Sequence, residues 1–216
     1  ARGGWGTGDG GRAPLAVADS VEAGTVVVPV PWLSLRGAGF ATFVSDEIVF
    51  DHVTARYLAT GRTRRLGVDT GASVRPFDGL RVALDLTWSD GHYTSTGEAI
   101  PYAPRLLVVG GLYAERLALG PTTLTGGLRA WVLGPRPLPG GFQSQPSAVV
   151  DFTSTLAWRS WGVSVEVDNV LGTAWRDGEF LYPSRWDLDA SRAELPVRHF
   201  TAGAPRAARL SLSRRF

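Results

Sequence analysis

The sequence predicts an all-β protein in which about nine long transmembrane strands form an antiparallel meander. Three observations support this fold class. Apolar and polar residues alternate over long stretches, these stretches exceed the usual length of strands in soluble sheets, and short connections alternate with long ones. Because successive side chains of a strand point to opposite faces, the alternation gives each strand one apolar and one polar face.

The alternation is clearest in the stretch from Leu80 to Trp88, where the apolar Leu84 is followed by the charged Asp85. Other stretches repeat the pattern, some of them less strictly. Each is bounded by Gly, Pro or a polar run, which is typical of strand ends. The predicted strands in chain order are 21–28, 33–44, 65–75, 80–89, 105–115, 123–132, 150–159, 161–168 and 205–216.

The length of the strands favours a membrane-spanning sheet. Strands of soluble sheets usually have about five or six residues, whereas a tilted strand needs roughly 9 to 11 residues to cross the hydrocarbon core. Most of the predicted strands reach this length. A soluble all-β domain remains the alternative, because a sandwich or a propeller also has alternating strands.

The connections also favour a membrane barrel, in which short turns lie at one end and long loops at the other. Aromatic residues lie near the predicted short turns, as in the aromatic belts of membrane proteins. These residues are Trp32, Phe77, Trp158, Trp161 and Phe216. The predicted short turns are 29–32, 76–79, 119–121 and 159–161, and the predicted long loops are 51–62, 94–104, 135–147 and 171–204.

Composition excludes several classes of function. The formal net charge is +2 and the basic residues are scattered, so nucleic acid is not an expected partner. The chain has no Cys, which excludes disulfides and thiolate metal sites. Its histidines, His52, His92 and His199, fall in or beside predicted loops far apart in the sequence. We therefore predict no enzymatic activity, no cofactor and no metal site.

Several motifs resemble those of TonB-dependent outer-membrane receptors. The resemblance is carried by VDNVLGTAWR at 167–176, GEFLYPSR at 178–185, APRAARLSLSRRF at 204–216, IPYAPR at 100–105 and GRTRRLGVD at 61–69. Their order and spacing agree with the predicted strands. The first motif resembles the family's segment between the penultimate strand and the last external loop, and the third resembles the final strand.

The resemblance covers about residues 33–216 and implies that 1–216 is the C-terminal portion of a 22-stranded barrel in the outer membrane of a Gram-negative cell. It assigns 171–204 to the long last external loop and 205–216 to the final strand, and the Gly-rich residues at the start predict a loop at 1–12. The Gly-rich beginning and the absence of Met agree with a segment of a longer protein.

The resemblance also implies a function and partners. Such receptors import a scarce, bulky ligand, of the siderophore-iron, cobalamin or glycan class. The implied partners are outer-membrane lipid, a plug domain in cis, TonB of the energy-transducing complex, the barrel-assembly machinery and the small-molecule ligand. A passive porin-like channel without a plug remains a second possibility.

Three groups of candidate residues follow. The last external loop mixes aromatic and charged residues, as binding loops do; its candidate ligand-binding residues are Trp175, Arg176, Asp177, Phe180, Tyr182, Arg185, Trp186 and His199. Charged residues on the polar faces suit a hydrated lumen, and the predicted lumen-facing residues are Asp85, Arg129, Asp151, Glu166 and Asp168. We expect Arg129, Glu166 and Asp168 to form ion pairs that brace the barrel wall against the plug, in preference to contacting the ligand directly. The final strand resembles the signal for barrel assembly, carried by Leu210, Leu212 and Phe216.

Overall fold

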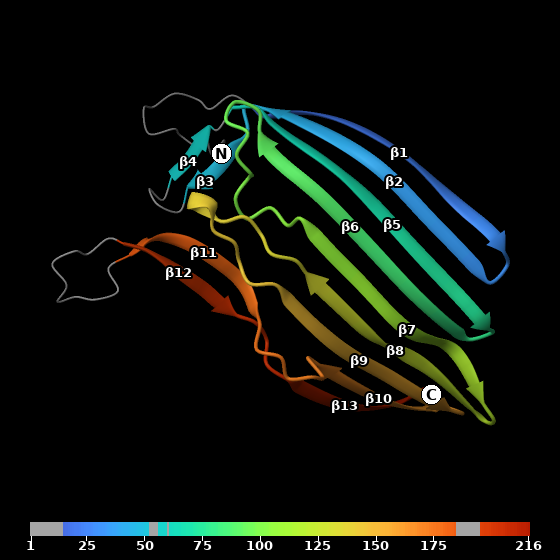
Figure 1. The fold of residues 1–216 in the computed structure, drawn as a ribbon. Coiled ribbons are helices and arrows are strands. Elements are labelled where there is room, and N and C mark those ends of the chain that lie inside the picture. Colours follow the sequence, from blue (N-terminus) through green and yellow to red (C-terminus); the bar gives the residue numbers. More distant parts are fainter. Residues whose placement is uncertain (1–14, 52–55, 60, 185–194) are drawn as a thin grey trace, which may run out of the picture.

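A computed structural model describes residues 15–51, 56–59, 61–184 and 195–216. Within these residues the chain is built almost entirely of antiparallel strands (Figure 1). The strands are β1 (Val17–Val30), β2 (Leu33–Ser45), β3 (Ile48–Asp51), β4 (Arg56–Ala59), β5 (Thr63–Phe77), β6 (Leu80–Tyr93), β7 (Leu106–Leu119), β8 (Thr122–Leu133), β9 (Ser147–Trp158), β10 (Trp161–Asp168), β11 (Arg176–Ser184), β12 (Leu195–Ala202) and β13 (Ala207–Arg214), with one short 3₁₀ helix, η1 (Pro139–Gly141).

Nine of these strands form one continuous sheet in the order β1-β2-β5-β6-β7-β8-β9-β10-β13. Neighbours in the sheet are neighbours along the chain, apart from the two inserted hairpins β3–β4 and β11–β12. This arrangement confirms the predicted antiparallel meander of nine strands. Within the described residues, no helix is long and apolar enough to cross a bilayer.

The connections differ at the two ends of the sheet. Two-residue turns join β1 to β2, β5 to β6, β7 to β8 and β9 to β10, and they lie together at one end (Figure 1). Gly79 and Gly120 supply the positive φ angles that two of these turns require, +85° and +60°. The hairpins β3–β4 and β11–β12 and the helix η1 lie at the opposite end, which we call the loop end.

The register aligns the alternating residues of all nine strands into two distinct faces. Asp85 is paired with Gly71, which is paired in turn with Arg36. The next row pairs Leu84 with Ala72, and Ala72 with Leu35. Because directly paired residues point to the same side of a sheet, the first row belongs to a polar face and the second to an apolar face.

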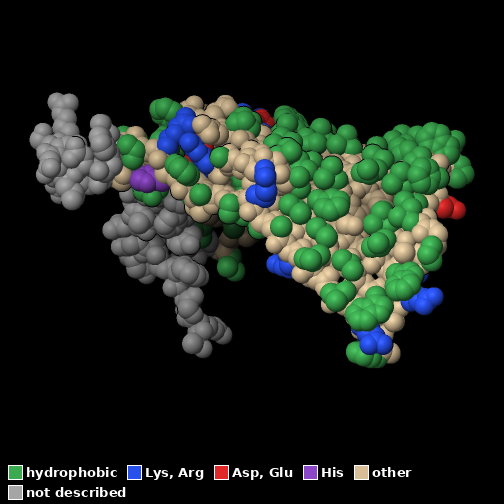
Figure 2. Space-filling view, turned by 90° about the horizontal axis from the view of Figure 1, so that it is seen from below, with side chains coloured by type: hydrophobic (Ala, Val, Ile, Leu, Met, Phe, Trp, Pro, Cys, Tyr) green, Lys and Arg blue, Asp and Glu red, His purple; other side chains and the backbone are tan. Residues whose placement is uncertain are grey.

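The apolar face is exposed and is not packed within the described chain. Leu84 keeps 53% of its surface exposed and Leu210 keeps 75%. Figure 2 shows hydrophobic side chains over much of one face of the molecule, with few charged side chains among them. The buried apolar residues of the described chain are instead near the loop end: Ile100, Leu138, Val149 and Leu181. The nine-stranded sheet therefore has no closed apolar interior.

Three of the four tight-turn hairpins contain a register shift beside the turn. In β1 the shift falls between Val27 and Val30, in β5 between Val74 and Phe77, and in β7 between Ala114 and Leu117. In each case two residues of the first strand lie opposite one residue of the second, which is the arrangement of a β-bulge.

The structure differs from the predicted elements mainly at the loop end. The predicted loop 171–204 contains the hairpin β11–β12. The predicted loop 51–62 contains β4, and β3 ends at its first residue. The final strand β13 is shorter than the predicted 205–216. The predicted loop 1–12 lies outside the described residues. The strands of the second hairpin escape a search for alternation because Pro183 and Pro196, which are paired there, are unusual within strands.

Candidate functional site

The candidate site lies at the loop end, where three segments meet. They are the hairpin β11–β12, the segment 134–146 that contains η1, and the segment 94–105 between β6 and β7. Since β7 and β8 are paired, the segment before β7 and the segment after β8 leave the sheet side by side. A backbone hydrogen bond from Tyr102 N to Pro137 O, 2.8 Å long, joins them.

A buried carboxylate holds the hairpin to the neighbouring loop. The side chain of Glu179 has no exposed surface, and Arg176 and Arg198 each donate to one of its oxygens over 3.0 Å. The backbone amide of Gln145 donates to the same carboxylate over 3.0 Å. A register shift between Arg176 and Gly178 turns Arg176 toward the face that carries Glu179. The two guanidinium groups and the amide compensate the burial of this charge.

The same contacts determine the ionisation of Glu179. Burial favours the neutral acid and works to raise its pKa, but the hydrogen bonds from Gln145 and Arg176 and the charges of Arg176 and Arg198 together outweigh this. The net result is a pKa of Glu179 below its usual value. The carboxylate is therefore ionised at neutral pH and acts as a fixed anionic anchor.

A second polar anchor lies where β10 ends. Asn169 is buried and adopts a positive φ of +50°, a conformation that Asn tolerates better than most residues. Its backbone amide donates to Asp151 over 2.9 Å. Its side-chain amide donates to the carbonyls of Thr173 and Ala204, and its side-chain oxygen accepts from the Thr173 amide. Asn169 therefore fixes both ends of the connection between β10 and β13.

Trp175 lies against this connection. Its indole nitrogen donates to Ala204 O over 3.1 Å, and its ring meets Trp131 edge to face with 5.1 Å between the ring centroids. A Cβ atom on Gly203 would lie 2.1 Å from the indole ring, so only glycine leaves room for it. Trp175 is thus a packed residue of the loop end, and its predicted contact with a ligand stays a prediction.

The structure places several other predicted ligand residues in ring contacts. Phe180 meets Tyr102 with 5.5 Å between ring centroids, and Tyr182 stacks on His199 at 3.8 Å. Asp177 is exposed. The hairpin thus brings Phe180, Tyr182 and His199 to one of its faces, while Arg176 points to the other and also covers Phe200. Arg185 and Trp186 lie outside the described residues. A ligand-binding role for all eight residues stays a prediction.

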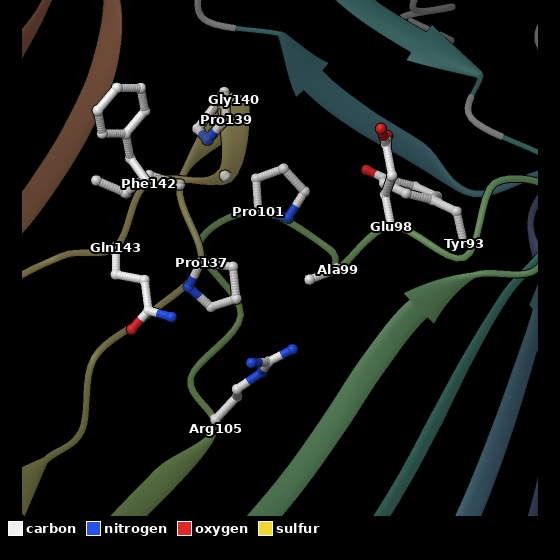
Figure 3. A pocket seen from close by; sticks show the side chains of 12 residues that line it. Tyr93, Glu98, Ala99, Pro101, Arg105, Pro137, Pro139, Gly140, Phe142 and Gln143 are labelled. Atoms are coloured by element: carbon white, nitrogen blue, oxygen red, sulfur yellow. The ribbon is translucent and has the colours of Figure 1, made fainter.

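A cavity of about 340 Å³ lies between the segments 94–105 and 134–146 (Figure 3). The sequence did not predict it. Its charged and polar lining comes from Tyr93, Glu98, Arg105 and Gln143, and much of the rest is contributed by proline and glycine together with Phe142. A pocket with a few convergent polar groups is the usual form of a small-molecule site. Among the described residues, no group of three or more His, Asp and Glu side chains could hold a metal ion.

The charged residues predicted to line a lumen share one face of the sheet by register. Arg36 forms ion pairs with Asp85 over 2.9 Å and with Asp69 over 2.7 Å. Glu166 binds Arg209 over 2.9 Å. Arg129 and Asp151 are paired across β8 and β9, and Asp168 lies two residues beyond Glu166 on β10. That this face lines a lumen stays a prediction.

The predicted assembly residues belong to the last strand of the sheet or follow it. Leu210 and Leu212 are paired with Val165 and Val163 on the apolar face, and both are exposed. Phe216 follows the end of β13 and is fully exposed. These positions leave the three side chains accessible, and their role in assembly stays a prediction.

No protein-family model and no curated protein matches the sequence. Solved structures do resemble it. The ferric yersiniabactin uptake receptor FyuA from Yersinia pestis aligns with a TM-score of 0.65 and 19% identity, over 91% of this chain and 29% of its own. The closed form of the ferric-catecholate import receptor Fiu from E. coli K12 aligns with a TM-score of 0.65 and 18% identity, over 100% and 30%. The outer-membrane ferripyoverdine receptor of Pseudomonas aeruginosa aligns with a TM-score of 0.65 and 15% identity, over 92% and 27%.

The exposed apolar face, the polar face and the meander define the class of structure as part of an outer-membrane β-barrel wall with its loops. The aligned structures make the fold more specific, because all three are receptors, two of them named for uptake or import and the third for the outer membrane. The chain has the fold of part of a TonB-dependent receptor barrel, as predicted. It spans less than a third of the length of these receptors.

Proposed function

We propose that this chain forms part of the wall and external loops of a TonB-dependent outer-membrane receptor. In this proposal the receptor imports a scarce, bulky ligand of the siderophore-iron, cobalamin or glycan class, and the loop end faces the outside of the cell. The partners in the full-length receptor are a plug domain in cis, TonB and the barrel-assembly machinery.

The two-faced sheet carries the proposal. The exposed apolar face is suited to acyl chains, because lipid surrounds the outside of a membrane barrel. The opposite face carries exposed ion pairs such as that of Arg36 with Asp85, which suit a water-filled lumen. The likeness of this fold to that of solved uptake receptors supports the proposal further. In addition, the hydrogen bonds of Glu179 and Asn169 give the external loops a fixed arrangement that can hold binding residues in place.

The proposal is tested with the full-length protein that contains this chain. It is expressed in cells that lack their own siderophore receptors, either with or without TonB. The probes are radioactive iron bound to a hydroxamate or a catecholate siderophore, radioactive cobalamin and a radioactive maltodextrin. We expect the protein in the outer-membrane fraction and accumulation of at least one probe only in cells that have TonB.

Two results would contradict the proposal. Accumulation that is equal with and without TonB would identify a passive channel. Recovery of the full-length protein in the soluble fraction would identify a soluble all-β domain and would also refute the membrane orientation of the apolar face.

A further inference from the structure

We propose that the cavity between the segments 94–105 and 134–146 binds an uncharged, hydroxyl-rich ring, such as one sugar unit of a glycan. This inference rests on the proposed function only in that the loop end faces the outside of the cell. It places a binding site away from the hairpin β11–β12, to which the sequence assigned the ligand contacts, and it selects one ligand class among those proposed.

The walls of the cavity are held in place before any ligand binds. The segment 134–146 folds back on itself through hydrogen bonds from Leu138 N to Phe142 O and from Ser144 N to Arg136 O. Ile100 and Leu138, two of the buried apolar residues of the described chain, lie in the two segments that form the walls. Three prolines of the lining restrict its backbone further: Pro101, Pro137 and Pro139. A preformed wall lowers the entropic cost of binding.

The charges around the cavity favour an uncharged ligand. Arg105 is bound to Asp90 over 3.1 Å, so its positive charge is balanced. Glu98 lies at another part of the lining and is exposed. An anion would be repelled by the Glu98 carboxylate and would find the Arg105 guanidinium already paired with Asp90. A cation would meet only Glu98, whose charge is screened by water because the side chain is exposed. A neutral hydroxyl group can donate to Glu98 and accept from Arg105 without either penalty.

The remaining lining residues fit a ring that has both hydroxyl groups and C–H surfaces. Gln143 offers an amide that donates and accepts, and Tyr93 offers a phenolic hydroxyl. Pro101 and Pro137, one from each segment, contribute apolar rings to the lining (Figure 3). Phe142 belongs to the lining and keeps 51% of its surface exposed. The volume of about 340 Å³ is near the lower end of the range for small-molecule pockets, roughly 300 to 1,000 Å³.

The experiment measures saccharide binding to the purified full-length protein in detergent by titration calorimetry. The free probes are maltotriose, cellotriose and diacetylchitobiose, and citrate serves as the anionic comparator. A fourth saccharide, an uncharged O-antigen repeating unit of lipopolysaccharide, distinguishes a surface glycan from a dissolved one as the source of the sugar. We expect at least one saccharide to bind and citrate not to bind.

Two variants locate the binding in the cavity, and a third is the matched control. We expect Gln143→Ala and Phe142→Ala each to weaken saccharide binding by about two- to tenfold, the effect of one lost hydrogen bond or ring contact. Gln145→Ala should leave the affinity unchanged, because Gln145 lies outside this cavity and binds Glu179 through its backbone amide.

The inference is overturned if no saccharide binds, if citrate binds in preference to the saccharides, or if Gln143→Ala and Phe142→Ala bind as tightly as the unchanged protein. These outcomes are separable from the uptake experiment, because binding in detergent does not require TonB. TonB-dependent accumulation of another probe without saccharide binding would refute the sugar site alone. Saccharide binding without TonB-dependent uptake would refute the proposed transport alone.

Discussion

The nine-stranded sheet leaves its apolar side chains exposed, whereas its loop end encloses side chains, including charged and polar ones. In the sheet, Leu84 and Leu210 are exposed and no apolar residue in the middle of a strand is enclosed by the described chain. At the loop end, the ionised Glu179 and the amide of Asn169 are buried among hydrogen-bond partners. This difference is explained by the different surroundings that the two regions have in the proposed receptor. In the proposed receptor, lipid covers the apolar face of the sheet, whereas loops in water must enclose an interior of their own. Here that interior combines polar contacts with buried apolar residues such as Ile100 and Leu138.

The sharpest test of this contrast is a charge on the apolar face. We expect Leu84→Arg to destabilise the folded full-length protein in bilayers by about 2 to 4 kcal/mol, because a guanidinium group near the bilayer midplane loses its hydration. Urea unfolding in lipid vesicles, followed by tryptophan fluorescence, measures the change. Ala83→Arg is the matched control on the adjacent residue of the opposite face and should cost clearly less. Equal costs for the two variants would mean that the faces do not meet different solvents.

The corresponding test at the loop end removes the charge of Glu179. We expect Glu179→Gln to make local opening of the hairpin easier by about 1 to 3 kcal/mol, because Arg176 and Arg198 lose a charged partner. Faster amide hydrogen exchange in β11 and β12, with unchanged exchange in β5 and β6, would report this. Glu115→Gln, which removes an exposed carboxylate far from the loop end, is the control and should leave the hairpin unchanged.

The pH dependence of the same variant supplies a second measurement. The pKa of Glu179 is lower in the folded protein than in the unfolded chain. The carboxylate therefore contributes its full stabilisation at pH values above its unfolded-state pKa, and this stabilisation is lost as the pH falls through its folded-state pKa. The hairpin should therefore keep its slow hydrogen exchange at neutral and mildly acidic pH and lose it only at lower pH. The Glu179→Gln variant should lack this acid-dependent loss. An identical pH profile in both proteins would contradict the assignment.

The smallest effect is expected from the ion pairs on the polar face of the sheet. Arg36 binds both Asp69 and Asp85, but all three side chains are partly exposed. We expect Arg36→Ala to change the free energy of unfolding by less than about 1 kcal/mol, because water and salt screen such pairs. Urea unfolding at low and high salt measures it. A loss as large as that of Leu84→Arg would indicate that this face is dry and closed.

Much of the sheet could be predicted because its determinants are local. Alternation places Leu84 and Asp85 on opposite faces without knowledge of any other strand, and Gly79 and Gly120 mark turns by their own conformational freedom. The two-faced meander, its order and its four tight turns all follow from such signals. The family motifs then indicated which kind of barrel these strands belong to.

The loop end could not be predicted in the same way because its determinants are distant in sequence. The partners of Glu179 come from three places in the chain: Arg176, Arg198 and Gln145. The paired prolines of β11 and β12 also hid the hairpin. The cavity did have a usable signal, because the pairing of β7 with β8 already implies that the segments 94–105 and 134–146 are neighbours.

The bulges beside the tight turns shift the alternation by one residue. Counted straight along β5, Phe77 would lie on the same side as Asp69 and Ser73, which is the polar face. The extra residue between Val74 and Phe77 instead sets Phe77 opposite Leu80, on the side of Leu84. Each of the three bulges thus shifts the alternation of its strand by one residue beside the turn, so that the apolar side chain that follows the bulge lies on the apolar face. Deletion of the extra residue between Val74 and Phe77 would remove this shift. The phenyl ring of Phe77 would then lie on the polar face although no apolar residue had been replaced.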